Sequence, residues 1–227
     1  MSIVAINKPK GITSHDVVNR VRKITGIKRV GHGGTLDPLA TGVLVVAIGR
    51  EFTKQLDQFV KGEKEYLAKI CLGFHSTTDD FEGEKTQIVV DVIPDSNTVK
   101  NVVESFIGDI QQTPPNYSSI KLSGVPAHRR MRRRENISLK SREVKIYDIQ
   151  TISYQYPYLE LKVTTGPGVY IRALARDIGE KLKTGGYLAE LQRTKVAEYT
   201  LNKALTLEEF EEQYNHSRSQ LTVDDSR

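Results

Sequence analysis

The chain has 227 residues, of which 38% are hydrophobic and 27% charged, and its formal net charge is +5 with an isoelectric point near 9.1. This length allows a sizeable core, and this composition is typical of a soluble globular protein. No apolar run approaches the roughly 20 residues of a membrane-spanning helix, and the N-terminus lacks the regions of a secretion signal. We therefore expect a cytoplasmic protein without a membrane partner.

The single cysteine, Cys71, cannot form an intramolecular disulfide, which agrees with a reducing compartment. We expect it to be a small buried residue in a strand. No group of His, Cys, Asp and Glu has the spacing of metal ligands, so we expect neither a metal nor an organic cofactor.

The first part of the chain predicts two strands and two helices. Residues 1–9 read as a short strand followed by a turn, and Thr13 or Ser14 can cap a helix that Gly26 ends. Residues 43–48 are a continuous apolar run, typical of a buried strand. A short helix is expected next, with three apolar residues on one face, namely Leu56, Phe59 and Val60.

The middle of the chain predicts a strand, a loop and a helix. Residues 65–72 alternate as in a strand, whereas residues 74–87 are polar and acidic and predict a loop. Asp95 or Ser96 can cap the next helix. Its apolar residues recur at i, i+3, i+4 and i+7, namely Val99, Val102, Val103 and Phe106.

The last part predicts two strands, over residues 144–154 and 158–165, followed by two helices. The second of these helices is short and carries Leu188 and Leu191. The first has its apolar side formed by Ile171, Leu174, Ala175, Ile178 and Leu182.

The predicted strands outnumber the helices and do not alternate with them regularly. This order favours an α+β domain with a mixed, largely antiparallel sheet flanked by helices. We assign residues 1–213 to this domain and residues 214–227 to a polar tail that we expect to fray.

The most unusual segment runs from Gly31 to Gly42 with the sequence GHGGTLDPLATG. Its glycines permit positive φ angles, and Pro38 favours an extended conformation at Asp37, so we expect a loop rather than a helix or strand. The loop has neither of the common phosphate-binding glycine motifs. Its one carboxylate is either a turn-forming or a catalytic group. If buried and ionised, it needs a partner, and the candidates are Lys8, Arg172, Arg176 and the amide groups of the loop itself.

An arginine run follows His128. Such a cluster is either a solvated helix face or a surface for phosphate groups. The run consists of Arg129, Arg130, Arg132, Arg133 and Arg134.

Five segments, in order and at similar spacing, resemble motifs of the TruB family of tRNA pseudouridine synthases. The segment from Gly31 to Leu44 is similar to the catalytic motif of that family. The resemblance covers roughly residues 3–210. The other four segments are Asn7–Gly11, Lys64–Tyr66, Pro114–Lys121 and Gly168–Asp177.

This resemblance implies a pseudouridine synthase fold and an isomerase that converts uridine 55 in the T-loop of tRNA to pseudouridine, without metal or cofactor. Residues 1–213 would be the catalytic domain, and we expect no PUA domain, the small RNA-binding domain that bacterial members generally carry at the C-terminus. The expected partner is the T-arm of tRNA, and we expect a monomer. Two alternatives stay open: a synthase acting on another RNA, and a non-catalytic module that binds or folds tRNA.

The resemblance also implies three catalytic residues. Asp37 matches the catalytic carboxylate, which acts either as a nucleophile or through a glycal route. Arg172 matches the arginine that pairs with this carboxylate and keeps it ionised. Tyr66 matches the tyrosine that stacks on the target base and is proposed to take part in proton removal. From its strand position alone, Tyr66 would be a core residue.

Substrate contacts follow from the same resemblance. His32 matches a histidine that packs against extruded T-loop bases, although a loop histidine can also simply bind backbone groups. Asp80 matches an acid that contacts the flipped nucleotide, and Asp79 is a neighbouring candidate. The further substrate-binding residues are Lys8, Tyr170 and Leu191.

Overall fold

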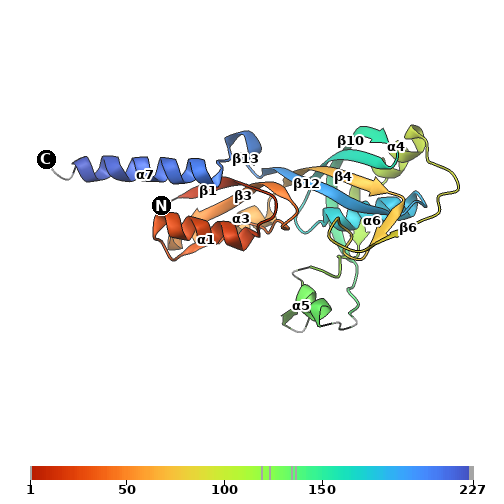
Figure 1. Cartoon of the computed structure of the whole chain (residues 1–227), viewed down its shortest axis with the longest axis horizontal. Coiled ribbons are helices and arrows are strands. Elements are labelled where there is room, and N and C mark those ends of the chain that lie inside the picture. Colours follow the sequence, from red (N-terminus) through yellow and green to blue (C-terminus); the bar gives the residue numbers. More distant parts are fainter. Residues whose placement is uncertain (1, 119, 123, 134, 136, 225–227) are drawn as a thin grey trace. The chain divides into compact units, whose positions relative to one another are not determined.

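A computed structural model describes residues 2–118, 120–122, 124–133, 135 and 137–224. It divides into two compact units (Figure 1). Unit 1 contains Met1–Glu65 and Gln192–Arg227, and unit 2 contains Tyr66–Leu191. Two strands, β4 (Lys64–Leu72) and β12 (Gly186–Val196), contribute residues to both units.

Unit 1 is built around β3, a strand that pairs antiparallel with β1 and β2 and parallel with the end of β12. In the parallel pairing, Gly42 lies opposite Arg193. The bounds of the remaining elements are β1 (Ile3–Lys8), α1 (Ser14–Thr25), β2 (Val30–His32), β3 (Thr41–Ile48), α2 (Arg50–Thr53), α3 (Leu56–Lys61), β13 (Tyr199–Thr200), a 3-10 turn (Leu201–Lys203) and α7 (Leu207–Asp224).

Helix α1 begins and ends as its sequence predicts. Thr13 and Asp16 form a reciprocal capping box at its start, and Gly26 ends it in the left-handed region at φ 72°. The apolar face of α1 packs against the strands and α7 (Figure 1). Its buried valines are Val17, Val18 and Val21.

Helix α7 extends to Asp224, so residues 214–224 are helical, and the fraying expected for the polar tail stays a prediction. The hydroxyl of Tyr214 donates to the carbonyl oxygen of Thr25 at 3.1 Å, and Phe210 is buried beside it. On the exposed side, Arg20 and Glu211 form an ion pair at 2.6 Å. These contacts hold α7 against α1 as far as Tyr214.

Unit 2 has the strand order β12, β4, β11, β10, β7, and two short hairpins lie outside this order. The bounds of its further elements are β5 (Phe74–Ser76), β6 (Lys85–Gln87), α4 (Ser96–Glu104), β7 (Gly108–Gln112), β8 (Lys121–Leu122), β9 (Val125–Pro126), α5 (Ala127–Arg132), β10 (Arg142–Gln155), β11 (Tyr158–Thr165) and α6 (Ile171–Lys181).

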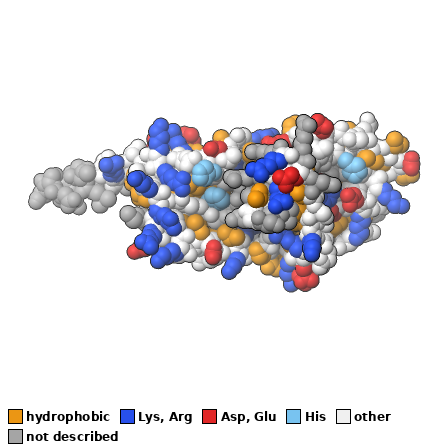
Figure 2. Space-filling view, turned by 90° about the horizontal axis from the view of Figure 1, so that it is seen from below, with side chains coloured by type: hydrophobic (Ala, Val, Ile, Leu, Met, Phe, Trp, Pro, Cys, Tyr) orange, Lys and Arg blue, Asp and Glu red, His pale blue; other side chains and the backbone are white. Residues whose placement is uncertain are grey.

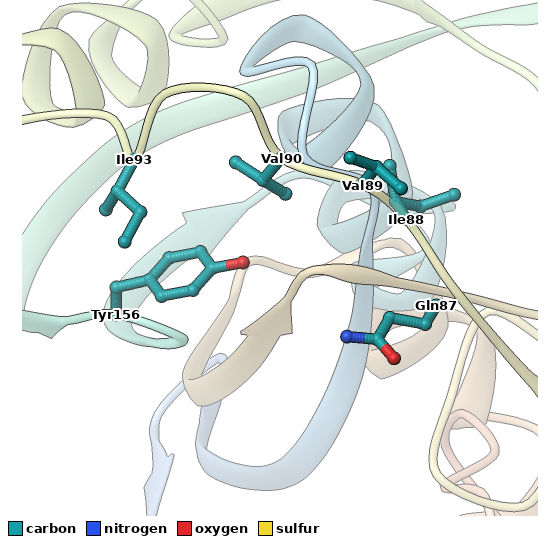
Figure 3. Close-up of a pocket in the computed structure, with 6 residues that line it drawn as sticks. All are labelled: Gln87, Ile88, Val89, Val90, Ile93 and Tyr156. Carbon is teal, nitrogen blue, oxygen red and sulfur yellow. The ribbon is translucent and has the colours of Figure 1, made fainter.

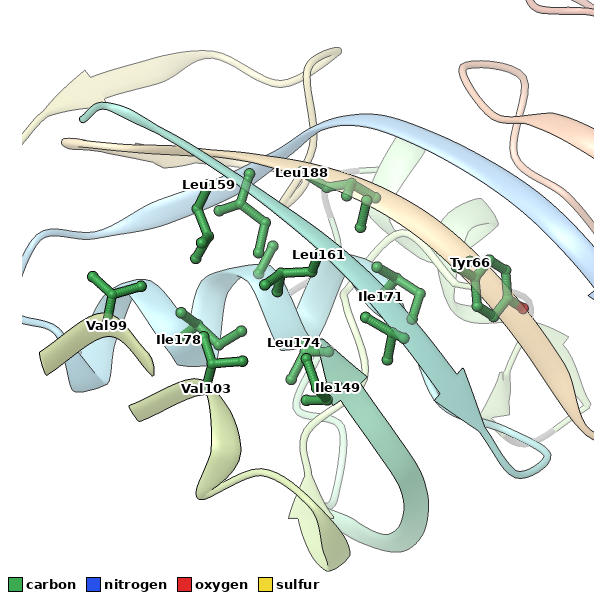
Figure 4. Close-up of a cluster of buried hydrophobic side chains, with 14 of the residues drawn as sticks. Tyr66, Val99, Val103, Ile149, Leu159, Leu161, Ile171, Leu174, Ile178 and Leu188 are labelled. Atoms are coloured by element: carbon green, nitrogen blue, oxygen red, sulfur yellow. The ribbon is translucent and has the colours of Figure 1, made fainter. Parts of the chain in front are cut away.

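The core of unit 2 lies between α4, α6 and the strands β4, β10 and β11 (Figure 4). Asp95 caps α4 by accepting from the N–H of Thr98 at 2.7 Å. Cys71 is buried in β4, as predicted. The predicted α+β class, with a mixed and largely antiparallel sheet flanked by helices, is confirmed.

Several predicted elements need correction. The short helix predicted at Leu188 and Leu191 is part of strand β12, and the loop predicted over residues 74–87 begins and ends in the paired strands β5 and β6. The segment from Gly31 to Gly42 is a loop only over residues 33–40, because its ends lie in β2 and β3. On α3, Phe59 is buried but Val60 is 44% exposed, so the predicted apolar face is narrower.

The arginine run is only partly described. Arg129, Arg130 and Arg132 lie on α5, which stands away from the main strands of unit 2 (Figure 1). Arg130 forms an ion pair with Glu135 at 3.5 Å, and Arg133 is exposed. Arg134 and the side chains of Arg129 and Arg132 lie outside the described residues.

A cavity of about 560 Å³ opens on unit 2 beside residues 88–93, a segment that contains the exposed apolar side chains of Val89, Val92 and Ile93 (Figure 3). It is lined by Gln87, Ile88, Val89, Val90, Ile93 and Tyr156, none of which is a predicted site residue.

Within the described part of the chain, no helix has the length and apolar character needed to cross a membrane. Among the same residues, no three His, Cys, Asp or Glu side chains group as metal ligands.

Candidate active site

Asp37 opens a tight turn in the loop of residues 33–40, hereafter the Asp37 loop. The N–H of Ala40 donates to the carbonyl oxygen of Asp37 at 3.0 Å, with Pro38 at the second turn position, where its fixed φ fits. Just before the turn, the hydroxyl of Ser14 accepts from the N–H of Leu36 at 2.8 Å and donates to the carbonyl of Leu36 at 3.0 Å. The half-buried carboxylate therefore stands on backbone that is fixed on both sides.

Lys8 holds the loop from the end of β1. Its buried ammonium donates to the carbonyl oxygens of Pro9 and Ile12 at 2.8 Å and of Pro38 at 3.4 Å. Burial lowers the pKa of Lys8 to about 8, although the negative charge of Asp37 acts in the opposite direction. All three N–H donors of this ammonium are thus used within the protein.

Arg193 is the residue of this site that sequence analysis missed. Its side chain is 1% exposed and binds three carbonyl oxygens of the chain that enters and leaves the Asp37 loop. Nε donates to Val43 at 2.8 Å, and the two terminal nitrogens donate to Thr35 at 3.3 Å and Gly34 at 3.1 Å. An arginine beside Leu191 and Gln192 carries no local signal that its partners lie roughly 150 residues earlier.

Gly42 makes this arrangement sterically possible. Its φ is 103°, and a Cβ at this position would lie 2.2 Å from the carbonyl oxygen of Arg193. Only glycine allows the two strands to approach so closely here. The glycine richness of the segment is therefore explained in part by packing against Arg193.

His32 ends β2 and leads into the Asp37 loop. Burial lowers its pKa, and the positive charges of Arg193 and His15 lower it further. These effects favour the uncharged form of the ring, which suits a side chain that packs against a nucleobase.

Because the pKa of Lys8 is lowered on folding, the stability of unit 1 should vary with pH in the alkaline range. Between about pH 8 and 10, the unfolded chain binds more protons at this lysine than the folded chain, so the free energy of unfolding should rise with pH. Lys64, whose pKa burial also lowers to about 8, acts in the same direction. Urea unfolding at about pH 7.5 and 9.5 should show this rise. The rise should be smaller in Lys8→Met and unchanged in the exposed control Lys54→Met; equal slopes in all three proteins would contradict it.

In unit 2, Arg172 and Asp80 form a buried ion pair at 3.2 Å, with side-chain exposures of 7% and 3%. Asp80 also accepts from the Thr78 hydroxyl at 2.5 Å and from the N–H of Glu82 at 3.0 Å. Arg172 further donates to the carbonyl of Tyr117 at 2.9 Å. Two predicted site residues are thus brought into direct contact, and Asp80 is held by several donors.

Asp79, the neighbouring candidate, points to a different arginine. Its carboxylate accepts from Arg176 at 2.8 Å, and its backbone has φ 60°, in the left-handed region. The carbonyl of Asp79 accepts from the N–H of Leu188 in β12 at 3.0 Å. The loop of residues 77–83, hereafter the Asp80 loop, is therefore bound to both α6 and β12.

Tyr66 lies at one end of the unit 2 core, and its hydroxyl points away from the other labelled side chains (Figure 4). Its side chain is buried, and Leu191 is partly buried against the same cluster. Tyr170 precedes α6, where the side chain of Gln112 binds its N–H at 2.8 Å and its carbonyl at 3.2 Å. The Tyr170 ring also lies 5.2 Å from the guanidinium of Arg142.

Each unit thus brings some of the predicted residues together. Unit 1 places Lys8 and Asp37 around one loop, which His32 adjoins, and unit 2 pairs Asp80 with Arg172. The predicted pairing of Asp37 with Arg172 joins residues of different units and stays a prediction.

Comparison with protein families gives a match to the TruB family pseudouridylate synthase N-terminal domain over residues 22–171. The chain belongs to the TruB family. A second match, to the tRNA pseudouridylate synthase B C-terminal domain, covers residues 172–225. The family predicted from the five segments is confirmed.

Relatives named tRNA pseudouridine synthase B support this TruB assignment. The protein of Prochlorococcus marinus is 43% identical over 210 residues, covering 91% of this chain and 66% of the relative. Those of Corynebacterium diphtheriae and Thermobifida fusca are also 43% identical, covering 92% and 91% of this chain and 72% and 73% of the relatives. The chain therefore spans about two thirds to three quarters of their length.

Solved structures agree with the predicted pseudouridine synthase fold. A chain in the structure titled "Crystal Structure of a Cbf5-Nop10-Gar1 Complex" has a TM-score of 0.73 and 28% identity, covering 94% of this chain and 54% of that chain. A chain in "Structure of H/ACA RNP bound to a substrate RNA containing 2'-deoxyuridine" has a TM-score of 0.71 and 26% identity, covering 96% and 55%. This chain spans about half of each.

Proposed function

We propose that this TruB family chain isomerises uridine 55 in the T-loop of tRNA to pseudouridine. The observation that carries the proposal is the Asp37 loop, a turn that presents one half-buried carboxylate. Hydrogen bonds from Lys8, Ser14 and Arg193 to backbone groups hold this loop in place. Asp37, Tyr66 and Arg172 take the catalytic roles predicted from sequence.

The reaction needs a carboxylate of this kind. The bond between C1′ of the ribose and N1 of uracil breaks, the base turns, and a bond forms between C1′ and C5. The proton of C5 leaves to solvent, and N1 gains a proton, so atoms balance without a co-reactant. A carboxylate beside C1′ either attacks it or stabilises its developing positive charge. A rigid loop keeps the carboxylate oriented for that step.

The remaining residues prepare the substrate. Extruding a base from a folded RNA costs a few kcal/mol, and a ring stacked on a displaced base offsets about 1–3 kcal/mol. We assign this stacking role to His32. Asp80, Tyr170 and Leu191 contact the flipped nucleotide. Lys8 serves the substrate through the loop it holds, since its donors are already used.

The surface charge suits an RNA partner. Figure 2 shows one face of the molecule, over which many Lys and Arg side chains are spread, with histidine and acidic side chains among them. The net charge of the chain is +5. Such a surface attracts phosphate groups in a salt-dependent way. The T-arm of tRNA is the partner we propose, bound by a monomer in the cytoplasm.

The arginine run is a second proposed phosphate-binding surface. Replacing Arg130, Arg132 and Arg133 by Gln should weaken tRNA binding and reduce the slope of log Kd against log salt by up to about one unit for each phosphate group that is no longer bound. A matched control is Lys100, Lys140 and Lys162→Gln, three cations elsewhere in unit 2. Filter binding at several salt concentrations measures both slopes. An unchanged slope would show that these arginines do not bind phosphate groups and are a solvated helix face.

The proposed function is tested with tRNA carrying tritium at C5 of uridine. Tritium should be released to water, a transcript with U55→C should lose that release, and EDTA should not inhibit it. Release that persists after U55→C would favour a synthase acting at another position or on another RNA. Tight binding without any release would favour the non-catalytic module.

A further inference from the structure

Two arginines on α6 connect the same two segments of unit 2 to that helix. Arg172 and Arg176 are four residues apart, so their side chains lie on one face of the helix. Each guanidinium binds a carboxylate of the Asp80 loop and a backbone carbonyl within residues 113–117. The sequence resemblance accounts for the first arginine but gives the second no role.

The contacts of Arg176 are specific. One terminal nitrogen donates to Asp79 at 2.8 Å, and the other donates to the carbonyl of Thr113 at 2.9 Å. Nε and the second terminal nitrogen also donate to Asp177 in the same helix, at 2.9 and 2.8 Å. The guanidinium thus joins three parts of unit 2 at once.

The contacts of Arg172 repeat this pattern one helical turn earlier. Its guanidinium binds Asp80 at 3.2 Å, the carbonyl of Thr78 at 3.3 Å and the carbonyl of Tyr117 at 2.9 Å. Consecutive residues of the Asp80 loop therefore point to consecutive arginines of α6. A shift of Asp79 would be transmitted directly to Asp80.

The loop conformation depends on such anchoring. Asp79 has φ 60°, a region that residues other than Gly, Asn and Asp rarely adopt. Its side chain is 15% exposed, and burial raises its pKa even though Arg176 and Arg172 act to lower it. Without Arg176, the negative charge of this half-buried carboxylate would be poorly compensated. Opening of the loop would then be favoured, because it would let water hydrate the carboxylate.

We propose that Arg176 is a positioning residue that orders the Asp80 loop before RNA binds, so that Asp80 is presented to the flipped nucleotide in one fixed geometry. The proposal rests on the proposed function for its catalytic consequence. The ordering itself is a property of the free protein. Arg176 acts through Asp79 and touches neither substrate nor reacting atoms.

Three variants separate this role from general surface electrostatics. Arg176→Gln removes every contact of the guanidinium, and Asp79→Asn removes only the charge in the loop while keeping a residue that tolerates φ 60°. Asp177→Asn is the matched control, because Asp177 binds the same guanidinium from within α6 and does not reach the loop. A fourth variant, Arg176→Lys, keeps the positive charge but cannot span Asp79 and Thr113 together.

The first measurement is hydrogen exchange of residues 77–83 in the protein without RNA. Exchange should be at least about tenfold faster in Arg176→Gln and Asp79→Asn, intermediate in Arg176→Lys, and unchanged in Asp177→Asn. The amide of Leu188, which donates to the carbonyl of Asp79, should lose protection in the same variants. Unchanged exchange in Arg176→Gln, or equal changes in Asp177→Asn, would overturn the proposal.

The second measurement is single-turnover pseudouridine formation. The rate should fall about tenfold in Arg176→Gln and in Asp79→Asn, with no further fall in the double variant and with the Kd for tRNA within about twofold of wild type. Additive decreases, or decreases confined to tRNA affinity, would contradict a shared positioning role. If the wild type forms no pseudouridine, the proposed function fails, whereas hydrogen exchange still decides whether Arg176 orders the loop.

Discussion

Asp37→Asn should abolish pseudouridine formation, with a fall in single-turnover rate on the order of a thousandfold or more, the scale for removing a group that acts in the chemical step. The amide has nearly the shape of the carboxylate but can neither attack C1′ nor balance a developing positive charge. The turn should persist, because its bonds are made by the backbone and by Lys8 and Ser14. Tritium release and tRNA binding measure the two consequences separately.

The matched control for this variant is Asp57→Asn, which removes an exposed carboxylate of α3 in the same unit. It should retain the wild-type rate and the wild-type Kd. Turnover by Asp37→Asn at the wild-type rate would show that Asp37 does not act in the chemical step. A parallel decrease in tRNA binding and in thermal stability would show instead that the variant disturbs the loop.

Gly42→Ala should strongly destabilise unit 1, because no other glycine of this unit has a shorter Cβ contact among those described. The added methyl group would lie 2.2 Å from the carbonyl oxygen of Arg193 and 2.9 Å from its backbone nitrogen, and φ is 103°. Backbone on both sides must move, which should lower the free energy of unfolding by about 3 kcal/mol or more. Urea unfolding monitored by circular dichroism measures this decrease.

Gly26→Ala provides the comparison that isolates the close approach. Gly26 also has a positive φ, 72°, but a Cβ there would meet nothing within 4 Å. Its cost should be only the conformational term, about 1–2 kcal/mol. Equal decreases in the two variants would show that packing against Arg193 adds nothing. The Gly42 variant should also have lower activity while folded, because the carbonyls of Gly34 and Thr35 are held by the same arginine.

Local signals were sufficient where an element contains its own start and stop. The capping box at Thr13 and Asp16, the left-handed Gly26 and the cap at Asp95 are short-range features, and the helices they delimit are observed. The long strands β10 and β11 were also predicted, as the strand-like runs 144–154 and 158–165. In these cases the residues that determine the structure are neighbours in sequence.

Prediction failed where distant pairing decides the structure. Leu188 and Leu191 are spaced three apart, which fits a helix face, yet both belong to β12, whose end pairs with β3 through Gly42 and Arg193. The polar residues 74–87 likewise gave no sign of the pairing between β5 and β6. Tertiary contacts outweighed local preference in both segments.

The residues of the candidate site likewise fall into those with a local sequence signal and those without one. Asp37 could be singled out because glycine and proline around one carboxylate are a local anomaly. Arg193 could not, since an arginine in an ordinary stretch looks solvent-exposed until its carbonyl partners are known. Arg176 was named only as a candidate partner of Asp37, and its observed partners Asp79 and Thr113 had no signal in the sequence. The residues that shape a loop from a distance are the ones that sequence patterns leave out.

The long sequence separation between Arg193 and the Asp37 loop also fixes an order of events during synthesis. Unit 2 is continuous in sequence, whereas unit 1 needs residues from both ends of the chain. On the ribosome, Gly34 and Thr35 emerge 159 and 158 residues before the arginine that binds their carbonyls, and unit 2 can fold in the interval. The contacts of Arg193 with Gly34, Thr35 and Val43 therefore form only after residue 193 has been synthesised, later than the contacts that Lys8 and Ser14 make with the same loop.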